Sequence, residues 1–329
     1  MTLTFTTFTK HHSTHILFLI ILMASSTRAA LSAARALPIP PLADQLRRAP
    51  SVFNFWDDNR ELFVDAWNEW ERSEEFSSVP ELDASLYDPR LRAAVEAAWA
   101  DPNTEADVSE LWTEVFPGVY ETQFFDPDRL ADLRAYLEAA WDAKIPLRPP
   151  YGIALNRGGA MLDPRSEGYL AAPNFQAFYR DLMDAYARPI ARLLFPDVVG
   201  NDSQTFGFSI QWVPKKDTSL RMHTDASAAT LNININLPGE EFSGSAVRFV
   251  DRATGEEKQL SFKPGTALIH HGSVMHASEP ITEGERHNLV LWLYGDHGRV
   301  PHGLQSVPDI TPRERWSIPD VEPDQFAPF

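Results

Sequence analysis

The stretch ATLNININL, residues 229–237, alternates apolar and polar side chains without a break. Successive side chains of an extended chain point to opposite faces, so residues two apart share a face. One face is apolar and carries Leu231, Ile233, Ile235 and Leu237. The other face is polar and carries Thr230, Asn232, Asn234 and Asn236. The pattern predicts a β-strand. Its asparagine face fits either a solvated outer surface or the polar interior of a barrel that holds a ligand.

Further strand-like segments surround this one after Pro196. They are TFGFSIQWV (205–213), AVRFV (246–250), KQLSF (258–262), TALIHH (266–271) and NLVLWLY (288–294). Gly, Pro and Asp separate them, and no helical pattern intervenes. Short strands at such intervals predict an antiparallel sandwich or barrel.

Residues before 196 have a different pattern. Apolar residues recur at spacings of three and four in residues 59–76, 88–101, 126–143 and 174–195, which predicts helices. The last of these helices is expected to bend near Pro189. A short strand is expected at 118–125. The chain is therefore expected to be mainly β with flanking helices.

Composition restricts the chemistry. The 329 residues include no cysteine, which excludes disulfides, thiolate zinc sites, iron–sulfur clusters and a cysteine nucleophile. Any metal must be held by His, Asp and Glu. The formal net charge of -17 argues against a nucleic-acid partner, which would need a basic face.

The N-terminus reads as a targeting segment. The apolar run ILFLIILMA (16–24) follows Lys10, His11 and His12, and no acidic residue precedes Asp44. This pattern is typical of a secretory signal peptide, here assigned to residues 1–36. It predicts the secretory pathway, either the endoplasmic reticulum or Golgi lumen or secretion. An uncleaved anchor, which would bring membrane association, and an organellar transit peptide remain open.

The segment RMHTDAS (221–227) contains a candidate metal site. His223 and Asp225 are two residues apart, so both side chains leave the same face of an extended chain. His276 follows 53 residues after His223 (276 − 223), far enough for the chain to cross a sheet and return. Two imidazoles and one carboxylate form the facial triad of non-haem Fe(II) oxygenases.

Arg286 adds a fourth element, at the start of the apolar strand 288–294. A buried guanidinium needs an anionic partner, and its planar fork suits a carboxylate. A dicarboxylic cosubstrate could meet the metal at one end and Arg286 at the other. Each residue alone has a simpler interpretation, such as a chance His-x-Asp, a core histidine or a surface ion pair. Their order and spacing together favour the metal site.

With these residues in place, the chain resembles a known family. The segments HTDASAATLNININLPGEEFSGSAVRFVD and GTALIHHGSVMHASEPITEGERHNLVLWLYG resemble the Fe(II)/2-oxoglutarate-dependent dioxygenases, in the prolyl/lysyl hydroxylase branch. The catalytic domain of procollagen lysyl hydroxylases is the most similar. FSIQWVPKKDTSLRMH and GVYETQFFDPDRLADLRAYL extend the resemblance over residues 112–297.

The resemblance implies a double-stranded β-helix, the jelly-roll or cupin-like form. It divides the chain into the segment 1–36, a helical extension (37–111), the dioxygenase domain (112–297) and a C-terminal Pro-rich tail (298–329). His223, Asp225 and His276 match the catalytic iron ligands. Arg286 matches the residue that binds the distal carboxylate of 2-oxoglutarate, and Asn232 matches a cosubstrate contact. The implied cofactors are Fe(II), 2-oxoglutarate and O2, with ascorbate.

The sequence departs from that pattern at two places. Trp212 stands where lysyl hydroxylases have tyrosine, and Gly244-Ser245 replaces a pair of glycines. His271, a rival to His276, falls where the family has a residue that is not a ligand. Asp225 argues for hydroxylation, since halogenating relatives have a small residue there.

The expected reaction is hydroxylation of a C–H bond, with release of succinate and CO2. The substrate implied by the resemblance is a peptidyl lysine or proline. A free amino acid or other small metabolite is the alternative, and a non-catalytic jelly-roll binding protein is a third interpretation.

Overall fold

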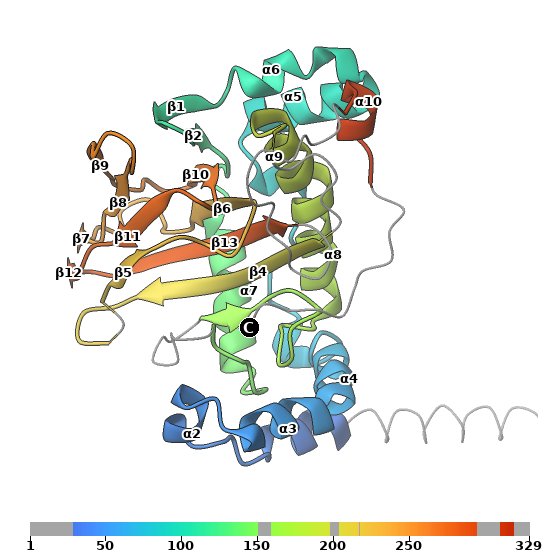
Figure 1. Cartoon of the computed structure of the whole chain (residues 1–329). Coiled ribbons are helices and arrows are strands. Elements are labelled where there is room, and N and C mark those ends of the chain that lie inside the picture. Colours follow the sequence, from blue (N-terminus) through green and yellow to red (C-terminus); the bar gives the residue numbers. More distant parts are fainter. Residues whose placement is uncertain (1–28, 151–158, 198–203, 217, 295–309, 319–329) are drawn as a thin grey trace, which may run out of the picture.

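The computed structural model describes residues 29–150, 159–197, 204–216, 218–294 and 310–318 (Figure 1). The described strands form two main antiparallel sheets. The larger sheet has the order β1-β2-β10-β6-β13-β4-β3 and the smaller the order β5-β11-β8-β9, beside a two-stranded pair β12-β7. The larger sheet consists of β1 (Thr113–Phe116), β2 (Val119–Gln123), β3 (Ala160–Met161), β4 (Gln204–Trp212), β6 (Ala229–Asn234), β10 (Thr266–His271) and β13 (Arg286–Tyr294). The other strands are β5 (Leu220–His223), β7 (Ser243–Gly244), β8 (Val247–Val250), β9 (Glu257–Leu260), β11 (Met275–Ser278) and β12 (Ile281–Glu283).

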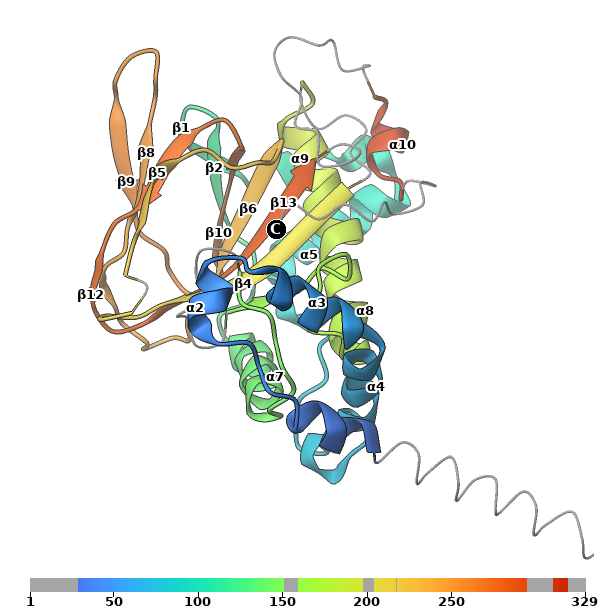
Figure 2. The ribbon, with the colours of Figure 1, turned by 60° about the horizontal axis from the view of Figure 1, so that its bottom comes forward.

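The chain alternates between the two main sheets. It passes from β4 in the larger sheet to β5 in the smaller, returns to β6, crosses to β8 and β9, returns to β10, and crosses to β11 before ending in β13. Figure 2 shows the two sheets facing each other with their strands on opposite sides of the barrel. This winding is that of a jelly roll. The fold class expected from the sequence is confirmed.

Strand β6 has the two faces that its alternation predicts. Leu231 and Ile233 are fully buried in the main hydrophobic core, together with residues of the helices. The opposite face points into the barrel, where the Asn288 side chain of β13 donates to Asn232 Oδ1 at 2.7 Å. Asn234 is 0% exposed. The asparagine face therefore lines a polar barrel interior, and the solvated-surface interpretation is wrong.

Helices cover the outer face of the larger sheet. They are α7 (Leu130–Asp142), α8 (Pro173–Asp181) and α9 (Arg188–Leu194), with a π-helical stretch η4 (Leu182–Ala187) between the last two. Their apolar side chains share one core with the outer face of β6, β10 and β13. The expected bend near Pro189 takes the form of this π-helical stretch, which ends just before the proline in the first turn of α9. Wider helical turns of this kind relieve the clash that a proline ring causes.

The N-terminal part of the described chain is helical. Its α-helices are α2 (Leu42–Leu46), α3 (Pro50–Asp58), α4 (Arg60–Trp70), α5 (Pro89–Ala100) and α6 (Ala106–Ser109), with 3-10 turns η1 (Glu74–Phe76), η2 (Ala84–Leu86) and η3 (Pro102–Thr104). Trp67 and Trp70 of α4 are almost fully buried in the core that also holds the sheet residues. Near the C-terminus, α10 (Pro312–Arg315) brings Trp316 against Trp99 of α5, with ring centroids 5.8 Å apart. The domain boundaries at residues 36, 111 and 297 stay predictions.

Residues 29–35 are helical and pack on the rest of the protein. Leu31 and Ala34 belong to the main core, and Arg35 Nε donates to the carbonyl of Ala143 at 2.7 Å. Residues 1–28, which hold the apolar run, lie outside the described part. Among the described helices, none combines the length and the hydropathy needed to cross a membrane.

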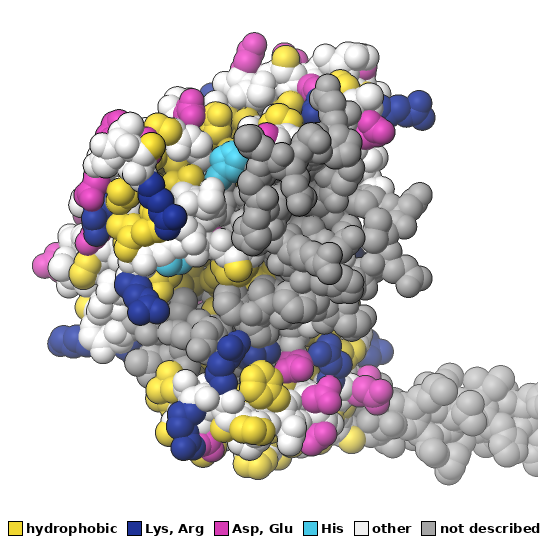
Figure 3. Space-filling model, in the orientation of Figure 1, with side chains coloured by type: hydrophobic (Ala, Val, Ile, Leu, Met, Phe, Trp, Pro, Cys, Tyr) yellow, Lys and Arg dark blue, Asp and Glu magenta, His cyan; other side chains and the backbone are white. Residues whose placement is uncertain are grey.

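The segment around α2 and α3 keeps apolar side chains on the surface. Four of the five exposed large hydrophobic residues of the described chain lie between residues 39 and 53: Ile39, Leu42, Leu46 and Phe53. Figure 3 shows hydrophobic side chains among charged ones over these helices, at the bottom of the view. The side chains of these four residues are not part of the main hydrophobic core.

Candidate metal centre

The smaller sheet brings the two histidines of the expected triad together. His223 is the last residue of β5, and His276 lies in β11 directly opposite it in the antiparallel register. Asp225 follows two residues after β5, and its backbone N–H donates to the carbonyl of Gly272 at 2.9 Å. A Cβ on Gly272 would lie 1.9 Å from the Ser227 carbonyl oxygen, so only glycine allows this close approach. The turn after β10 thereby holds the loop that carries Asp225.

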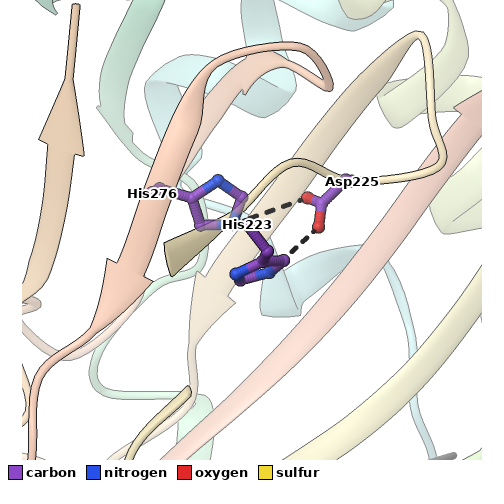
Figure 4. A group of neighbouring side chains, drawn as sticks. All are labelled: His223, Asp225 and His276. Atoms are coloured by element: carbon purple, nitrogen blue, oxygen red, sulfur yellow. Dashed lines mark ion pairs between the residues drawn. The ribbon is translucent and has the colours of Figure 1, made fainter. Parts of the chain in front are cut away.

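All three side chains face one point (Figure 4). The Nε2 atom of His223 lies 3.4 Å from Asp225 Oδ1, and that of His276 lies 3.7 Å from Asp225 Oδ2. One ligand atom from each residue lies within 4.8 Å of the other two. Among the described residues this is the one group of three metal-ligating side chains at such spacing. The structure thus brings together the three residues that the sequence singled out.

Backbone carbonyls set the tautomers of both histidines. His223 Nδ1 lies 2.8 Å from the Arg221 carbonyl, and His276 Nδ1 lies 3.0 Å from the Val274 carbonyl. A carbonyl oxygen only accepts, so each Nδ1 carries the proton and each Nε2 keeps its lone pair. Both lone pairs are directed toward the Asp225 side. Such orientation by a second hydrogen bond is typical of metal-binding histidines.

The protonation states also suit a divalent metal. Burial alone would raise the pKa of the Asp225 carboxyl, but His276, His223, His270 and the Thr230 hydroxyl outweigh it and hold that pKa well below its usual range. Burial lowers the pKa of His276, with Asp225 opposing the shift, whereas at His223 burial is outweighed by Asp225 and the pKa of that ring is raised. The site therefore offers a charged carboxylate and a neutral imidazole, the forms that bind metal. Nitrogen and oxygen donors with three protein ligands fit Fe(II) with open positions.

A pair of hydroxyls supports the carboxylate. Thr230 Oγ1 donates to Asp225 Oδ2 at 2.6 Å and lies 2.8 Å from Ser227 Oγ. Thr230 is 2% exposed and Ser227 1% exposed, so water does not replace these contacts. The two hydroxyls fix the rotation of the carboxylate, which decides which oxygen faces the histidines.

We expect Thr230→Val to lower metal affinity about 10- to 100-fold, as loss of a partner behind a metal ligand does elsewhere. Valine keeps the shape and removes the hydrogen bond to Asp225. Thr230→Ser is the matched control, because it keeps the hydroxyl and is expected to retain affinity within a few-fold. Titration with Co(II), followed by visible absorption, measures both variants. Equal Co(II) affinity of the valine variant and the wild type would contradict the role of this hydroxyl.

The structure adds a histidine that sequence reasoning missed. His270 of β10 is 2% exposed, and its Nε2 lies 4.0 Å from Asp225 Oδ2. Its ring centroid is 4.7 Å from that of His276. Burial lowers the pKa of His270 to about 4, so the ring is neutral near pH 7. Its neighbour His271 points to the opposite face of β10, where its ring packs 4.4 Å from that of Phe195. His271 therefore lies outside the triad.

Arg286 lies inside the barrel without an anionic partner among the described residues. Its side chain is 1% exposed, and Nη1 donates to the Ser245 carbonyl while Nη2 donates to Ser278 Oγ at 3.1 Å. The Nε atom has no hydrogen-bond partner in the described part of the chain. The guanidinium carbon lies 5.5 Å from the Trp212 ring centroid and 5.4 Å from that of Phe262. Burial lowers the pKa of Arg286 to about 9.

A buried cation with a free donor fits an anionic ligand. Ser278 connects this end to the metal centre, since it lies two residues beyond His276 on β11 and on the same face. Two residues of a strand span about 7 Å, which is comparable to the length of a five-carbon dicarboxylic acid. The arrangement suits a diacid with one end at the triad and the other at Arg286.

The side chain of Asn232 belongs to a network of hydrogen-bonded asparagines on β6 and β13. Its Oδ1 accepts from Asn288, while Asn234 lies close enough to Asn288 for a longer contact of 3.4 Å. The Oδ1 contact orients the Asn232 amide group, whose N–H donors remain for other partners. The sequence signal for this network was the row of three asparagines. The role of Asn232 as a cosubstrate contact stays a prediction.

Among known proteins, the chain is similar to 2-oxoglutarate and iron-dependent oxygenases. No protein-family model matches the chain. It is 26% identical over 208 residues to the Arabidopsis thaliana 2-oxoglutarate and iron-dependent oxygenase domain-containing protein ICU11, covering 59% of this chain and 48% of that protein. The Danio rerio 2-oxoglutarate and iron-dependent oxygenase domain-containing protein 2 is 28% identical over 67% of this chain and 63% of its own length.

Procollagen lysine hydroxylases are also among the relatives. The multifunctional procollagen lysine hydroxylase and glycosyltransferase of Rattus norvegicus is 28% identical over 41% of this chain and 18% of its own length. A Pseudomonas putida prolyl-4-hydroxylase structure aligns with a TM-score of 0.39 at 20% identity, over 62% of this chain and 98% of that one. The chain spans between about half and two thirds of its first relatives. The resemblance expected from the sequence, including its lysyl hydroxylase branch, is confirmed.

Proposed function

We propose that this chain, a relative of the 2-oxoglutarate and iron-dependent oxygenases, is itself a dioxygenase that hydroxylates a C–H bond. The observation that carries the proposal is the pairing of two features in one barrel. The ligand atoms of His223, Asp225 and His276 converge on one point, and Arg286 lies buried in the same barrel with no anionic partner among the described residues. A non-catalytic binding protein would not need both.

The residues have distinct tasks in this proposal. His223, Asp225 and His276 would hold Fe(II), and Arg286 would hold the distal carboxylate of 2-oxoglutarate. Bound iron with 2-oxoglutarate and O2 would supply the oxidising power, with succinate and CO2 as products. The buried walls around Arg286, including Trp212 and Phe262, exclude water from the cosubstrate. Exclusion of water strengthens the charge interaction at that end.

The proposed substrate is a peptidyl lysine or proline. The support is the similarity to proteins named procollagen lysine hydroxylases, which covers about two fifths of this chain (41% and 42%). The negative net charge of the chain adds no support for this substrate, because two exposed arginines lie beside the metal centre. Arg221 precedes His223 by two residues, and Arg252 contacts Met275, which is next to His276. The net charge of -17 is therefore not concentrated at the site.

We expect the full chain with Fe(II), 2-oxoglutarate and O2 to release succinate and to add one oxygen atom to a peptide in a lysine- and proline-containing panel. Ascorbate is added to half of the reactions, since its use is part of the proposal. Mass spectrometry of the peptides and a succinate assay are the measurements, with Asp225→Ala as the control. Succinate release equal in both proteins would contradict the dioxygenase. Succinate release stimulated by a free amino acid, with no peptide modified, would contradict the peptidyl substrate.

We also propose entry to the secretory pathway through residues 1–36. The packing of Leu31, Ala34 and Arg35 favours a mature chain that keeps these residues, so cleavage would fall near Ala29 rather than after Ala36. N-terminal sequencing of the protein secreted by a eukaryotic host decides between these positions. A product that starts after Ala36, or that stays with the membrane, would contradict this proposal.

A further inference from the structure

A cavity of about 360 Å³ lies outside the barrel, between α7 and the outer face of the larger sheet. In Figure 1 this helix lies behind β4. The helix contributes one face to the cavity, because its lining residues are three and four apart: Arg134, Leu137, Glu138, Trp141 and Asp142. The volume is near the lower end of the range for small-molecule sites. Neither the triad nor Arg286 lines this cavity, so it is separate from the metal centre.

The sheet side of the cavity is polar, although the outer face of β6 carries core residues. Ser209 and Gln211 of β4 line it, with His287 of β13 directly opposite Gln211 in the antiparallel register. Ser209 is 3% exposed and Gln211 6% exposed. Gln211 Nε2 donates to Glu285 Oε2 and lies 3.3 Å from His287 Nε2. Polar side chains buried between a helix and a sheet cost free energy, which makes this place a candidate for ligand binding.

The charges at the cavity sum to a negative value. Its lining holds three carboxylates and two cations: Glu138, Asp142, Glu285, Arg134 and Lys216. Arg134 is 7% exposed and is held by two carboxylates, since Nη2 donates to Glu138 Oε1 at 3.2 Å and Nη1 to Glu240 Oε2 at 2.8 Å. Lys144 pairs with Asp142 at 3.2 Å. With these partners included, four carboxylates face three cations.

Glu285 carries the unbalanced charge. In the described part of the chain its side chain contacts Gln211 and the ring of His287, whose Nε2 lies 3.4 Å from Glu285 Oε2. Burial and the nearby Arg134 lower the pKa of His287 to about 4, so this ring is neutral near pH 7. The Glu285 side chain is 51% exposed, and its other oxygen is left to accept from a ligand. The cavity therefore favours a cation over an anion.

The walls of the cavity are apolar. Leu137 and Trp141 of α7 and Val213, which follows β4, are each partly exposed. An indole ring packs against alkyl chains and also attracts an ammonium group. A carboxylate beside such walls matches a ligand with an alkyl chain that ends in a positive charge.

We propose that this cavity binds a primary ammonium group on an aliphatic chain, with the ammonium at Glu285 and the chain along Trp141 and Leu137. Lysine has this chemistry, either as the free amino acid or as a side chain of a peptide. The inference goes beyond the proposed function and does not rest on it. Arg286 lies inside the barrel, whereas its chain neighbours Glu285 and His287 line this cavity on the other side of the sheet.

The test is calorimetric titration of the full chain with acetyl-lysine amide, without 2-oxoglutarate. Acetyl-norleucine amide has a similar side chain without the ammonium and is expected to bind at least about tenfold more weakly. Glu285→Gln and Trp141→Ala are each expected to weaken binding of acetyl-lysine amide about two- to fivefold. Free lysine is titrated in parallel. Similar affinities for both lysine ligands would support a free amino acid as the occupant, and binding of the amide alone would support a peptide side chain.

Two variants serve as controls. Glu283→Gln makes the same change at an exposed carboxylate of β12 outside the cavity lining and is expected to leave the affinity unchanged. Asp225→Ala removes a metal ligand and is also expected to leave it unchanged. Equal binding of the two amides would overturn the inference, as would binding that is lost in Asp225→Ala and kept in Glu285→Gln. A failure of the proposed function would appear separately, as absent succinate release from a protein that still binds acetyl-lysine amide.

Discussion

Replacing His276 by alanine is expected to lower metal affinity by more than about a hundredfold, because loss of a residue that merely supports a ligand already costs about 10- to 100-fold. The imidazole supplies one of three converging ligand atoms, and its Nδ1–H contact with the Val274 carbonyl holds Nε2 toward Asp225. Alanine leaves two ligands, too few to fix a divalent ion. Co(II) or Fe(II) binding, followed by calorimetry, measures the loss, and succinate release is expected to fall to background.

His271→Ala is the matched control for this experiment. The sequence offers both histidines within one segment, but His271 packs on Phe195 outside the barrel. Its loss removes the same number of atoms and is expected to change metal affinity less than about twofold. A contact with an aromatic ring contributes about 1 kcal/mol, so a modest loss of stability is expected in the control. Metal binding that survives in His276→Ala and fails in His271→Ala would reverse the assignment.

The sequence predicted the strands well where one side of the sheet is buried by apolar residues. In β6, leucine and isoleucine alternate with asparagine, and the buried asparagines of the structure follow that alternation. The pairing of β11 with β5 could not be predicted in this way. It joins residues far apart in the chain, and its register depends on the turn at Gly272 as much as on side-chain pattern. The triad was predicted from residue types and spacing, whereas its geometry comes from this pairing.

His270 shows why one site residue was missed. The segment TALIHH has apolar residues on both faces, Ala267 and Ile269 on one and Leu268 on the other, so its pattern does not show which face lines the barrel. Register with β6 decides it, because His270 lies opposite Thr230, whose side chain bonds to Asp225. A strand that is buried on both faces has no alternation of apolar and polar residues, so its sequence does not show which face lines the barrel.

Ser245 shows a second limit. The sequence marked the Gly244-Ser245 pair as a departure from two glycines, but a positive φ and a buried hydroxyl are properties of the folded backbone. In the structure Gly244 lies against Pro280, where a Cβ would come within 2.2 Å of the Pro280 carbonyl oxygen. That close approach is imposed by the pairing of β7 with β12, which local sequence does not determine.

Arg286→Met is expected to change stability and cosubstrate binding in opposite directions. In the free protein the buried guanidinium has no carboxylate partner among the described residues, and burial lowers its pKa to about 9. Methionine fills much of the space between Trp212 and Phe262 without burying a charge. Replacing even a buried ion pair with apolar side chains of similar volume is often neutral or stabilises proteins by about 1–4 kcal/mol, and the charge of Arg286 has no ion-pair partner among the described residues to offset its burial. The free energy of unfolding in urea, without ligand, is therefore expected to rise.

Cosubstrate binding is expected to fall by about 30-fold to several thousand-fold, because truncating one partner of a buried, hydrogen-bonded charge pair costs about 2–5 kcal/mol. Arg286→Lys keeps the charge but loses the planar fork, so its 2-oxoglutarate affinity is expected to lie between those of the wild type and Arg286→Met. Metal affinity, measured on the same proteins, is expected to stay within a few-fold, since Arg286 is not part of the triad. A methionine variant that is less stable and still binds 2-oxoglutarate normally would show that the guanidinium supports the fold instead of a ligand.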